Sequence, residues 1–369
     1  MKKRVLIILL AIFAVLSSAF ALSACEKDEN TDEYDKILKF IPYGDDAYTV
    51  AAVETDHIEN IVIPAKYRNK PVTRIASGAF MNKTYLREIV IPDSVTSIDD
   101  RAFYNCSSLT SINIPDSVRW ISDYAFYNCS SLTSINIPKG MFVMGEGAFR
   151  SCSSLTGVTF DKNSQLASIG NSAFYDCRML TSVEIPDSVT SIGKDAFYNC
   201  PIESATIPAL ACSYIKNENL KTVVITSGES IGNSAFNNCW SLTSVIIPDS
   251  VTSIGRDAFC GCSSLMSVNI PDGVSSIRER AFYGCTSLSS IEIHDSVTSI
   301  FYSAFYDCSG LKSVYYGGTE SDWANIEMGA ANDNFWNAAI YYFSETEPTE
   351  SGNYWHYDAD GVPAVWQSA

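Results

Sequence analysis

Cysteine is the residue type whose spacing first suggests chemistry in this chain. Nine of the 12 cysteines recur, mostly at steps of 23 residues, at Cys106, Cys129, Cys152, Cys177, Cys200, Cys239, Cys262, Cys285 and Cys308. Thiols at a fixed spacing can form disulfides or bind zinc. Equivalent side chains of stacked units point in parallel, however, and the chain has no C-x-x-C pair. We therefore predict buried free thiols, without a metal or a cofactor.

Histidine gives little support for catalysis. The chain has only His57, His294 and His356, and His294 occupies a turn position where most repeats have proline. The repeat geometry assembles no Ser-His-Asp grouping, and neither a P-loop nor a G-x-G-x-x-G motif occurs. The sequence therefore predicts a non-enzymatic protein without catalytic residues.

Six aspartates occupy the same turn position in different repeats. They are Asp93, Asp116, Asp187, Asp249, Asp272 and Asp295. Stacked carboxylates can bind calcium, whereas a single Asp, like the Ser beside it, can stabilise its own turn by local hydrogen bonds. Lys139 and Ala209 interrupt the row without a compensating acid. The turn role is favoured, and no metal ligand is predicted.

These residues belong to a tandem repeat. The pair Ala-Phe recurs with the same step, beginning at Ala79, Ala102, Ala125, Ala148, Ala173, Ala196, Ala235, Ala258, Ala281 and Ala304. Such a period is typical of a solenoid, whose coils stack around one shared core. In each unit, an L-x-x-I-x-I segment predicts a short strand, Pro-Asp-Ser a turn, and Ala-Phe and Cys the far side of the core.

Both ends of the array depart from the repeat. We expect the solenoid with its caps over residues 36–343, including a helix over 323–328 that is capped by residues 319–322, and a last strand over 338–343. One step of 39 residues predicts an extra, shortened coil over 202–225. Residues 344–353 form a linker, and residues 354–369 an aromatic hairpin that docks on another part of the protein.

The N-terminus has the features of a secretory signal. Basic residues at positions 2–4 precede an apolar run, which predicts a signal peptide over residues 1–24. The run ends in Leu22-Ser23-Ala24-Cys25, which resembles a bacterial lipobox and predicts lipidation of Cys25. The alternative is an ordinary cleaved signal with a chance cysteine. Residues 25–35 then form an acidic tether.

The charge of the chain excludes one class of partner. Lys and Arg total 25 against 42 Asp and Glu, which gives a formal net charge of −17. A surface of this sign repels nucleic acid and anionic lipid. We expect no nucleic-acid partner, and membrane contact only through a lipid anchor.

The repeat unit resembles the BspA-like type of leucine-rich repeat, most completely over residues 109–129, 132–152, 242–262, 265–285 and 288–308. The resemblance implies an α/β fold leaning towards all-β, a right-handed curved solenoid of about 11–12 coils with a concave parallel β-sheet. It also implies a secreted bacterial protein on the outer face of the cell, often an adhesin.

Outward strand positions are the candidate ligand-binding residues. On the concave face these are Ser111, Asn113, Ser134, Asn136, Ser182, Glu184, Ser244, Ser267, Asn269, Ser290 and Glu292. A tyrosine ridge on the opposite edge is the second candidate, at Tyr104, Tyr127, Tyr175, Tyr198, Tyr283 and Tyr306.

Three functions remain open at this stage. The leading hypothesis is a lipid-anchored adhesion protein that binds a host or bacterial surface protein or a glycan. The alternatives are a structural spacer or surface-coat component and a nutrient-capture subunit. A charged or aromatic cluster on the concave face favours adhesion, an even face favours a spacer, and a deep pocket favours capture.

Overall fold

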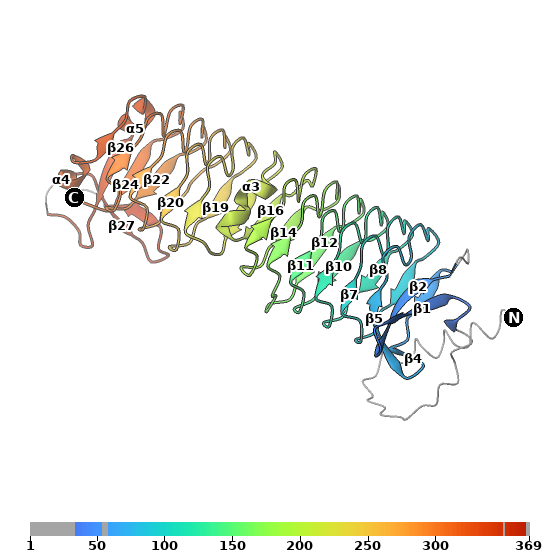
Figure 1. Cartoon of the computed structure of the whole chain (residues 1–369). Coiled ribbons are helices and arrows are strands. Elements are labelled where there is room, and N and C mark those ends of the chain that lie inside the picture. Colours follow the sequence, from blue (N-terminus) through green and yellow to red (C-terminus); the bar gives the residue numbers. More distant parts are fainter. Residues whose placement is uncertain (1–33, 54–57, 350, 367–369) are drawn as a thin grey trace.

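The computed structural model describes residues 34–53, 58–349 and 351–366. These residues wind into an elongated stack of coils, which runs from β1 (Leu38–Tyr43) and β2 (Ala47–Ala52) to β26 (Ala339–Phe343) (Figure 1). Most regular structure is parallel β, and the helices α3 (Cys212–Ile215), α4 (Glu320–Trp323) and α5 (Asp333–Trp336) have four residues each. The predicted, mainly β solenoid is confirmed.

The L-x-x-I-x-I segments form one parallel strand per coil, with the apolar residues inward. These first strands are β3 (Asn60–Val62), β6 (Glu88–Val90), β8 (Ser111–Asn113), β10 (Ser134–Ile137), β12 (Gly157–Phe160), β14 (Ser182–Glu184), β16 (Ser204–Ile207), β17 (Thr222–Ile225), β19 (Ser244–Ile246), β22 (Ser290–Ile293) and β24 (Ser313–Tyr316). The coil between β19 and β22 joins them through single bridges at Ser267 and Asn269.

Most coils also have a second strand, two residues long except for β5, that the sequence pattern did not predict. It contains the isoleucine that follows the Pro-Asp-Ser turn, or a methionine in two coils. These strands are β5 (Lys70–Ile75), β7 (Ser97–Ile98), β9 (Trp120–Ile121), β11 (Val143–Met144), β13 (Ser168–Ile169), β15 (Ser191–Ile192), β18 (Ser230–Ile231), β20 (Ser253–Ile254), β21 (Ser276–Ile277), β23 (Ser299–Ile300) and β25 (Glu327–Met328). Two residues are too few to show an alternating pattern.

The core is a set of ladders that run along the stack. The rings of Phe103, Phe126 and Phe149 are fully buried, with neighbouring centroids 5.0 and 5.1 Å apart. This spacing is close to that of hydrogen-bonded strands, because each coil repeats the one before it.

All eleven cysteines of the described chain are free and buried, as predicted. Eight thiols do more than fill space. Each donates to the backbone carbonyl of the phenylalanine in the preceding coil, at Sγ···O distances from 3.0 Å (Cys200 to Phe174) to 3.3 Å (Cys152 to Phe126). The thiol thus links successive coils within the core.

The serine of the Pro-Asp-Ser turn also links coils, and the prediction of a bond within its own turn was wrong. Ser188 Oγ donates to the carbonyl of Leu166 at 2.9 Å, and Ser250 Oγ to that of Gly228 at 3.0 Å. Stacking brings a carbonyl of the preceding coil within reach of the hydroxyl.

The shortened coil predicted over residues 202–225 is present and interrupts the second strands. A 3₁₀ turn, η1 (Ala209–Ala211), and helix α3 replace its second strand and Ala-Phe segment. The first strands continue without a break through β14, β16, β17 and β19, whereas the second strands end at β15 and restart at β18.

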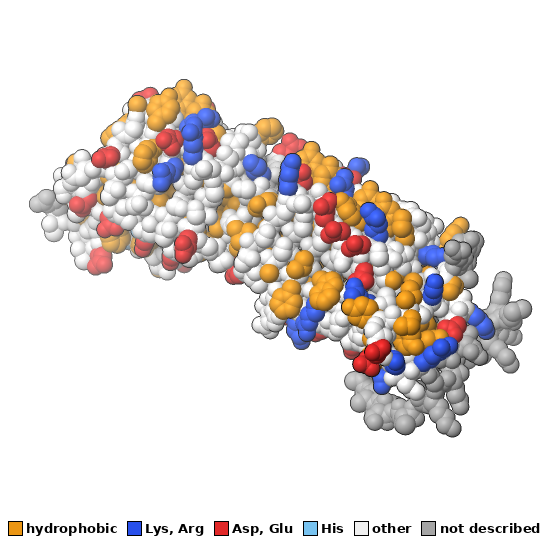
Figure 2. Space-filling view, in the orientation of Figure 1, with side chains coloured by type: hydrophobic (Ala, Val, Ile, Leu, Met, Phe, Trp, Pro, Cys, Tyr) orange, Lys and Arg blue, Asp and Glu red, His pale blue; other side chains and the backbone are white. Residues whose placement is uncertain are grey.

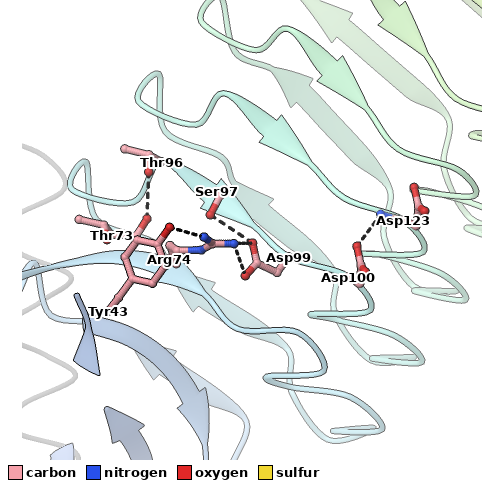
Figure 3. Close-up of polar contacts among 8 residues, drawn as sticks. All are labelled: Tyr43, Thr73, Arg74, Thr96, Ser97, Asp99, Asp100 and Asp123. Carbon is pink, nitrogen blue, oxygen red and sulfur yellow. Dashed lines mark hydrogen bonds and ion pairs between the residues drawn. The ribbon is translucent and has the colours of Figure 1, made fainter. Parts of the chain in front are cut away.

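The N-terminal cap is a hairpin, with β1 antiparallel to β2 and β2 parallel to β5. Strand β4 (Lys66–Tyr67) lies between the first and second strands of the first coil and pairs antiparallel with β5. Arg74 fastens the cap to the stack, since it donates to both carboxylate oxygens of Asp99 at 2.8 Å and to the Tyr43 hydroxyl at 2.7 Å (Figure 3).

At the C-terminal end the expected capped helix is present but short. Thr319 and Asp322 form the capping box of α4, which ends at Trp323. The sequence predicts a helix that continues to Met328. Residues 327 and 328 instead form β25, because they fall in register with β23.

The predicted aromatic hairpin consists of β27 (Tyr354–Tyr357) and β28 (Pro363–Val365). Strand β27 pairs in parallel with β26 and antiparallel with β28, so the hairpin extends the first-strand sheet. Trp355 is 1 % exposed, and its indole nitrogen donates to the carbonyl of Tyr316 at 2.8 Å. The expected docking of the hairpin is confirmed, and its platform is the end of the solenoid.

Candidate functional site

The outward side chains of the first strands form one long face, which we call the first-strand face. All eleven predicted ligand-binding positions of the strands lie on it and are exposed or half-buried. The face follows from strand geometry, since the residues between two inward apolar side chains must point to the opposite side of the sheet.

The structure gathers five of these residues in one hollow. The hollow has a volume of about 400 Å³ and lies where the C-terminal hairpin overhangs β22 and β24. Its predicted lining residues are Ser244, Ser267, Asn269, Ser290 and Glu292. Tyr315, Val362 and Pro363 complete the wall. The hairpin therefore converts part of a flat sheet into a concave site.

A second hollow of about 350 Å³ lies farther towards the N-terminus on the same face. It includes the predicted residues Ser182 and Glu184, together with Thr206, Thr222 and Val224 of the shortened coil. Val224 pairs in register with Ile246 of β19, and these side chains are 37 % and 57 % exposed. An apolar pair thus lies beside both hollows.

The remaining predicted residues lie outside both hollows. Ser111, Asn113, Ser134 and Asn136 are exposed on β8 and β10. The amide oxygen of Asn136 accepts a hydrogen bond from Thr159 at 2.9 Å. The lipidation candidate Cys25 lies outside the described residues.

Glu292 is the centre of a polar cluster in the first hollow. Its carboxylate accepts a hydrogen bond from the Tyr357 hydroxyl and lies 3.6 Å from Nε2 of His294. Nδ1 of His294 lies 2.5 Å from a carboxylate oxygen of Asp272. Burial and the bond to Glu292 raise the pKa of Tyr357, so its hydroxyl stays protonated and donating at neutral pH.

The cluster provides acceptors for a ligand that carries donors or positive charge. Within the described ranges, no group of three or more His, Cys, Asp or Glu side chains is placed to hold a metal ion. Of the turn aspartates, Asp272 belongs to this cluster, whereas Asp116 pairs with Lys139 at 3.1 Å and Asp187 accepts a hydrogen bond from Ser227 at 2.7 Å.

The tyrosine ridge forms stacked pairs along the opposite edge. Ring centroids are 4.6 Å apart for Tyr104 and Tyr127 and 5.1 Å apart for Tyr175 and Tyr198. Tyr198 and Tyr306 are the most exposed members, at 59 % and 44 %.

The candidate ligand-binding residues predicted from the sequence leave out the apolar and aromatic parts of the site. Val224 and Ile246 occupy outward strand positions that hold Ser, Thr, Asn or Glu in most coils, and this departure from the repeat was a usable signal. Tyr315 gives the same signal, since it pairs in register with Glu292 on an outward position of β24. Tyr357 gives none, because its contact with the face depends on where the hairpin docks.

On the face of the stack seen in Figure 2, the surface charges are not concentrated in one patch. Acidic and basic side chains are interspersed over the visible face of the stack, and much of that surface is uncharged (Figure 2). In the described part of the chain, no helix is both long and apolar enough to cross a bilayer.

Comparison with known proteins identifies the repeat. The family model described as "BspA type Leucine rich repeat region" matches in 6 copies over residues 53–166, 158–227 and 229–328. No curated protein matches.

Several solved structures are similar. A leucine-rich cell-surface protein of Faecalibacterium prausnitzii is 28 % identical over 84 % of this chain and 98 % of its own, with a TM-score of 0.38. A leucine-rich-repeat protein of Bacteroides ovatus is 27 % identical over the same shares, with a TM-score of 0.39. The pneumococcal vaccine antigen PcpA is 18 % identical over 84 % of this chain and 93 % of its own, with a TM-score of 0.43.

Proposed function

Because this chain belongs to the BspA-type leucine-rich-repeat family, we propose that it is a non-catalytic surface protein that binds another protein through its first-strand face. The contact region extends from β14 to β24 and includes both hollows. Cys25 carries the lipid that anchors the protein to the outer face of the cell membrane.

The observation that carries the proposal is the unevenness of the first-strand face. Two hollows lie beside the exposed pair Val224 and Ile246, with Glu184 in one and Glu292 in the other. Exposed apolar side chains surrounded by polar groups are typical of protein-binding sites. The partner that fits best presents apolar side chains flanked by Lys or Arg, because the fixed charges in the hollows are carboxylates.

Anchoring at the cell surface is supported by the residues before the solenoid. A basic and apolar segment precedes the Leu22-Ser23-Ala24-Cys25 motif, and these residues lie outside the described chain. One similar protein, from F. prausnitzii, is named as a cell-surface protein. Lipid chains on one cysteine give stable anchoring when two or more are present.

Neither alternative function explains the site as well. A spacer or coat component requires an even face, whereas this one has carboxylates, exposed apolar residues and a hairpin that overhangs one region. A nutrient-capture subunit is favoured by a deep pocket, whereas these hollows lie on the outward side of a sheet.

A binding panel with charge-matched variants tests the proposal. The purified mature protein is applied to immobilised fibronectin, fibrinogen, laminin and collagen and to a glycan array. The site variant combines Glu184→Lys with Asn269→Lys. The control combines Glu88→Lys with Asn113→Lys, which makes the same charge change on outward positions of β6 and β8, far from the hollows.

We expect binding to at least one protein of the panel. The site variant should lose at least about tenfold in affinity, as expected for a central interface position, and the control should keep it. Binding to glycans alone, or an equal loss in both variants, would contradict the proposal.

A further inference from the structure

The shortened coil leaves a notch on the edge of the stack that carries the Ala-Phe segments. The phenylalanine ladder stops at Phe197, which stacks on Phe174 at 5.2 Å, and restarts with Phe236 and Phe259 at 5.3 Å. Helix α3 and the loop after it take the place of the missing segment. The resulting hollow has a volume of about 810 Å³, within the range of small-ligand sites, about 300–1,000 Å³.

One wall of the notch is an aromatic ring with an open face. Tyr175 stacks on one side of Tyr198, but the next coil is the shortened one and lacks this segment, and the coil after it has Asn237 at the equivalent position, so no ring of the described chain stacks on the other side. Tyr198 is 59 % exposed, and Tyr214 of α3, which is 38 % exposed, also lines the notch. The tyrosine ridge is therefore interrupted at the notch, where Tyr198 offers an open aromatic face on which a flat ligand can stack.

The other walls are polar and balanced in charge. The charged lining residues are Arg178, Asp195, Lys216 and Glu218, two of each sign. Ser213, Asn199, Asn217 and Asn219 add hydroxyl and amide groups. This neutral lining is unusual in a protein with a net charge of −17, and it offers both donors and acceptors.

The loop that carries these groups is held in place. The amide nitrogen of Asn217 donates to the carbonyls of Ile202 at 3.2 Å and Ile215 at 3.0 Å, while its oxygen accepts from the Asn219 backbone at 2.8 Å. Lys216 reaches across to the carbonyl of Ser234 at 3.2 Å. A site fixed before binding loses less conformational entropy when the ligand arrives.

We propose that the notch is a second binding site, specific for an uncharged oligosaccharide. The C–H groups on one side of a sugar ring carry a small positive charge and pack on the electron-rich face of Tyr198. The hydroxyls, which donate and accept, pair with Ser213, Asn219 and the carboxylates of Asp195 and Glu218.

A sugar suits the notch better than a peptide does. The balanced charges select against an anionic or cationic ligand, and the adjoining second strands β15 and β18 have two residues each, which is too short an edge for an added strand. The several hydroxyl groups of each sugar unit match a lining that offers both donors and acceptors.

Calorimetry and saturation-transfer NMR test the proposal on the mature protein. The probes are maltohexaose, cellohexaose and mannohexaose, compared with a sulfated heparin hexasaccharide and a pool of neutral hexapeptides. The variants are Tyr198→Ala, Tyr198→Phe and, as a matched control, Tyr306→Ala, which removes the exposed ring of the separate stacked pair Tyr283 and Tyr306.

At least one neutral hexasaccharide should bind. Tyr198→Ala should weaken it by about tenfold, as expected for the loss of a stacking ring, while Tyr198→Phe and Tyr306→Ala should change the affinity less than about twofold. The variant Ile246→Asp on the first-strand face should leave sugar binding unchanged. The proposals for the sugar site and for the protein-binding face can therefore be refuted independently. The proposal is overturned if no neutral sugar binds, if the sulfated sugar or the peptides bind instead, or if Tyr198→Ala binds normally.

Discussion

Single residues of the repeat serve both the core and the contact between coils. Cysteine is small enough to fill the far side of a coil, and its thiol donates to the phenylalanine carbonyl of the preceding coil. The same carbonyl also accepts the cysteine backbone N–H of its own coil, as for Phe103 with Cys106 at 3.2 Å. The thiols thus stabilise the stack in their reduced form, without forming disulfides.

The buried thiols predict a loss of stability in alkali. Burial raises the pKa of Cys106, Cys152, Cys212 and Cys308 to about 12. Below pH 9 the thiols are protonated in both the folded and the unfolded chain, so their contribution is fully present. Between pH 9 and 12 only the unfolded chain ionises, and the free energy of unfolding should fall by about 1.4 kcal/mol per pH unit for each such thiol.

Urea unfolding between pH 7.5 and 10.5, with a reductant present, measures this slope. In the variant Cys106→Ala with Cys308→Ala, the loss of stability above pH 9 should be shallower than in the native protein. An unchanged slope would show that other groups cause the alkaline destabilisation.

Cys25 should carry the membrane anchor. In cells fed labelled palmitate, the native protein should be labelled and residues 1–24 should be absent from the mature chain. Cys25→Ser should abolish the label and release the protein or leave it unprocessed. Equal labelling of this variant would refute the lipidation of Cys25.

At the scale of the elements, the regular coils follow from the sequence because each position has one physical role that recurs. Leu109, Ile112 and Ile114 predict an inward-facing strand in one coil, and ten further coils repeat the argument. The shortened coil was visible as a step of 39 residues.

Features that depend on contacts between coils were not predictable in this way. All second strands except β5 are two residues long, and the serine hydroxyls bond across coils, so neither leaves a local pattern. Helix α3 has no capping side chain that would indicate its start in the sequence. The hollow below the hairpin joins Glu292 and Tyr357, which lie 65 residues apart.

Because the coils stack closely, a single methyl group added at a contact between coils should destabilise the fold. A Cβ added at Gly193 would lie 2.3 Å from the backbone nitrogen of Asn171 in the preceding coil. At Gly157 the same atom would meet nothing within 4 Å. Gly193→Ala should therefore lower the free energy of unfolding by about 1–3 kcal/mol, while Gly157→Ala should be neutral or slightly stabilising.

Denaturant unfolding of both variants checks this prediction. A comparable loss of stability in the two would mean that coil spacing does not limit the side chain at Gly193.

The C-terminal hairpin should protect the end of the stack. Trp355→Ala removes a buried ring and its bond to Tyr316, which should cost about 3–5 kcal/mol locally. Hydrogen exchange should speed up in β24, β26 and β27 and stay unchanged in β8 and β10, because each coil of a solenoid contacts only its neighbours. Trp336→Ala is the control, since that ring is 53 % exposed. Uniform exchange along the stack would contradict this local role.

In the whole molecule, stacking repeats the same small polar surface from coil to coil. The candidate binding sites lie where a coil departs from the repeat. Outward positions of the first strands are mostly small and polar, so most coils offer only a solvated face. The hairpin creates one hollow and the shortened coil contributes to another. The same shortened coil opens the notch on the opposite edge of the stack.

The most direct measurement compares the same substitution at two equivalent strand positions. Ile246 and Val90 are the third residues of β19 and β6, and both are exposed, at 57 % and 48 %. Only Ile246 lies beside the hollows. Ile246→Asp and Val90→Asp therefore differ in where they place a charge and not in what they do to a strand.

The affinity of each variant is measured by biolayer interferometry for the protein partner found in the binding panel. Ile246→Asp should weaken binding by at least about tenfold, because it places an unpaired carboxylate at the centre of an interface, and Val90→Asp should stay within about twofold of the native protein. Unchanged binding by Ile246→Asp, or an equal loss in Val90→Asp, would contradict the assignment of the partner site to the first-strand face between β14 and β24.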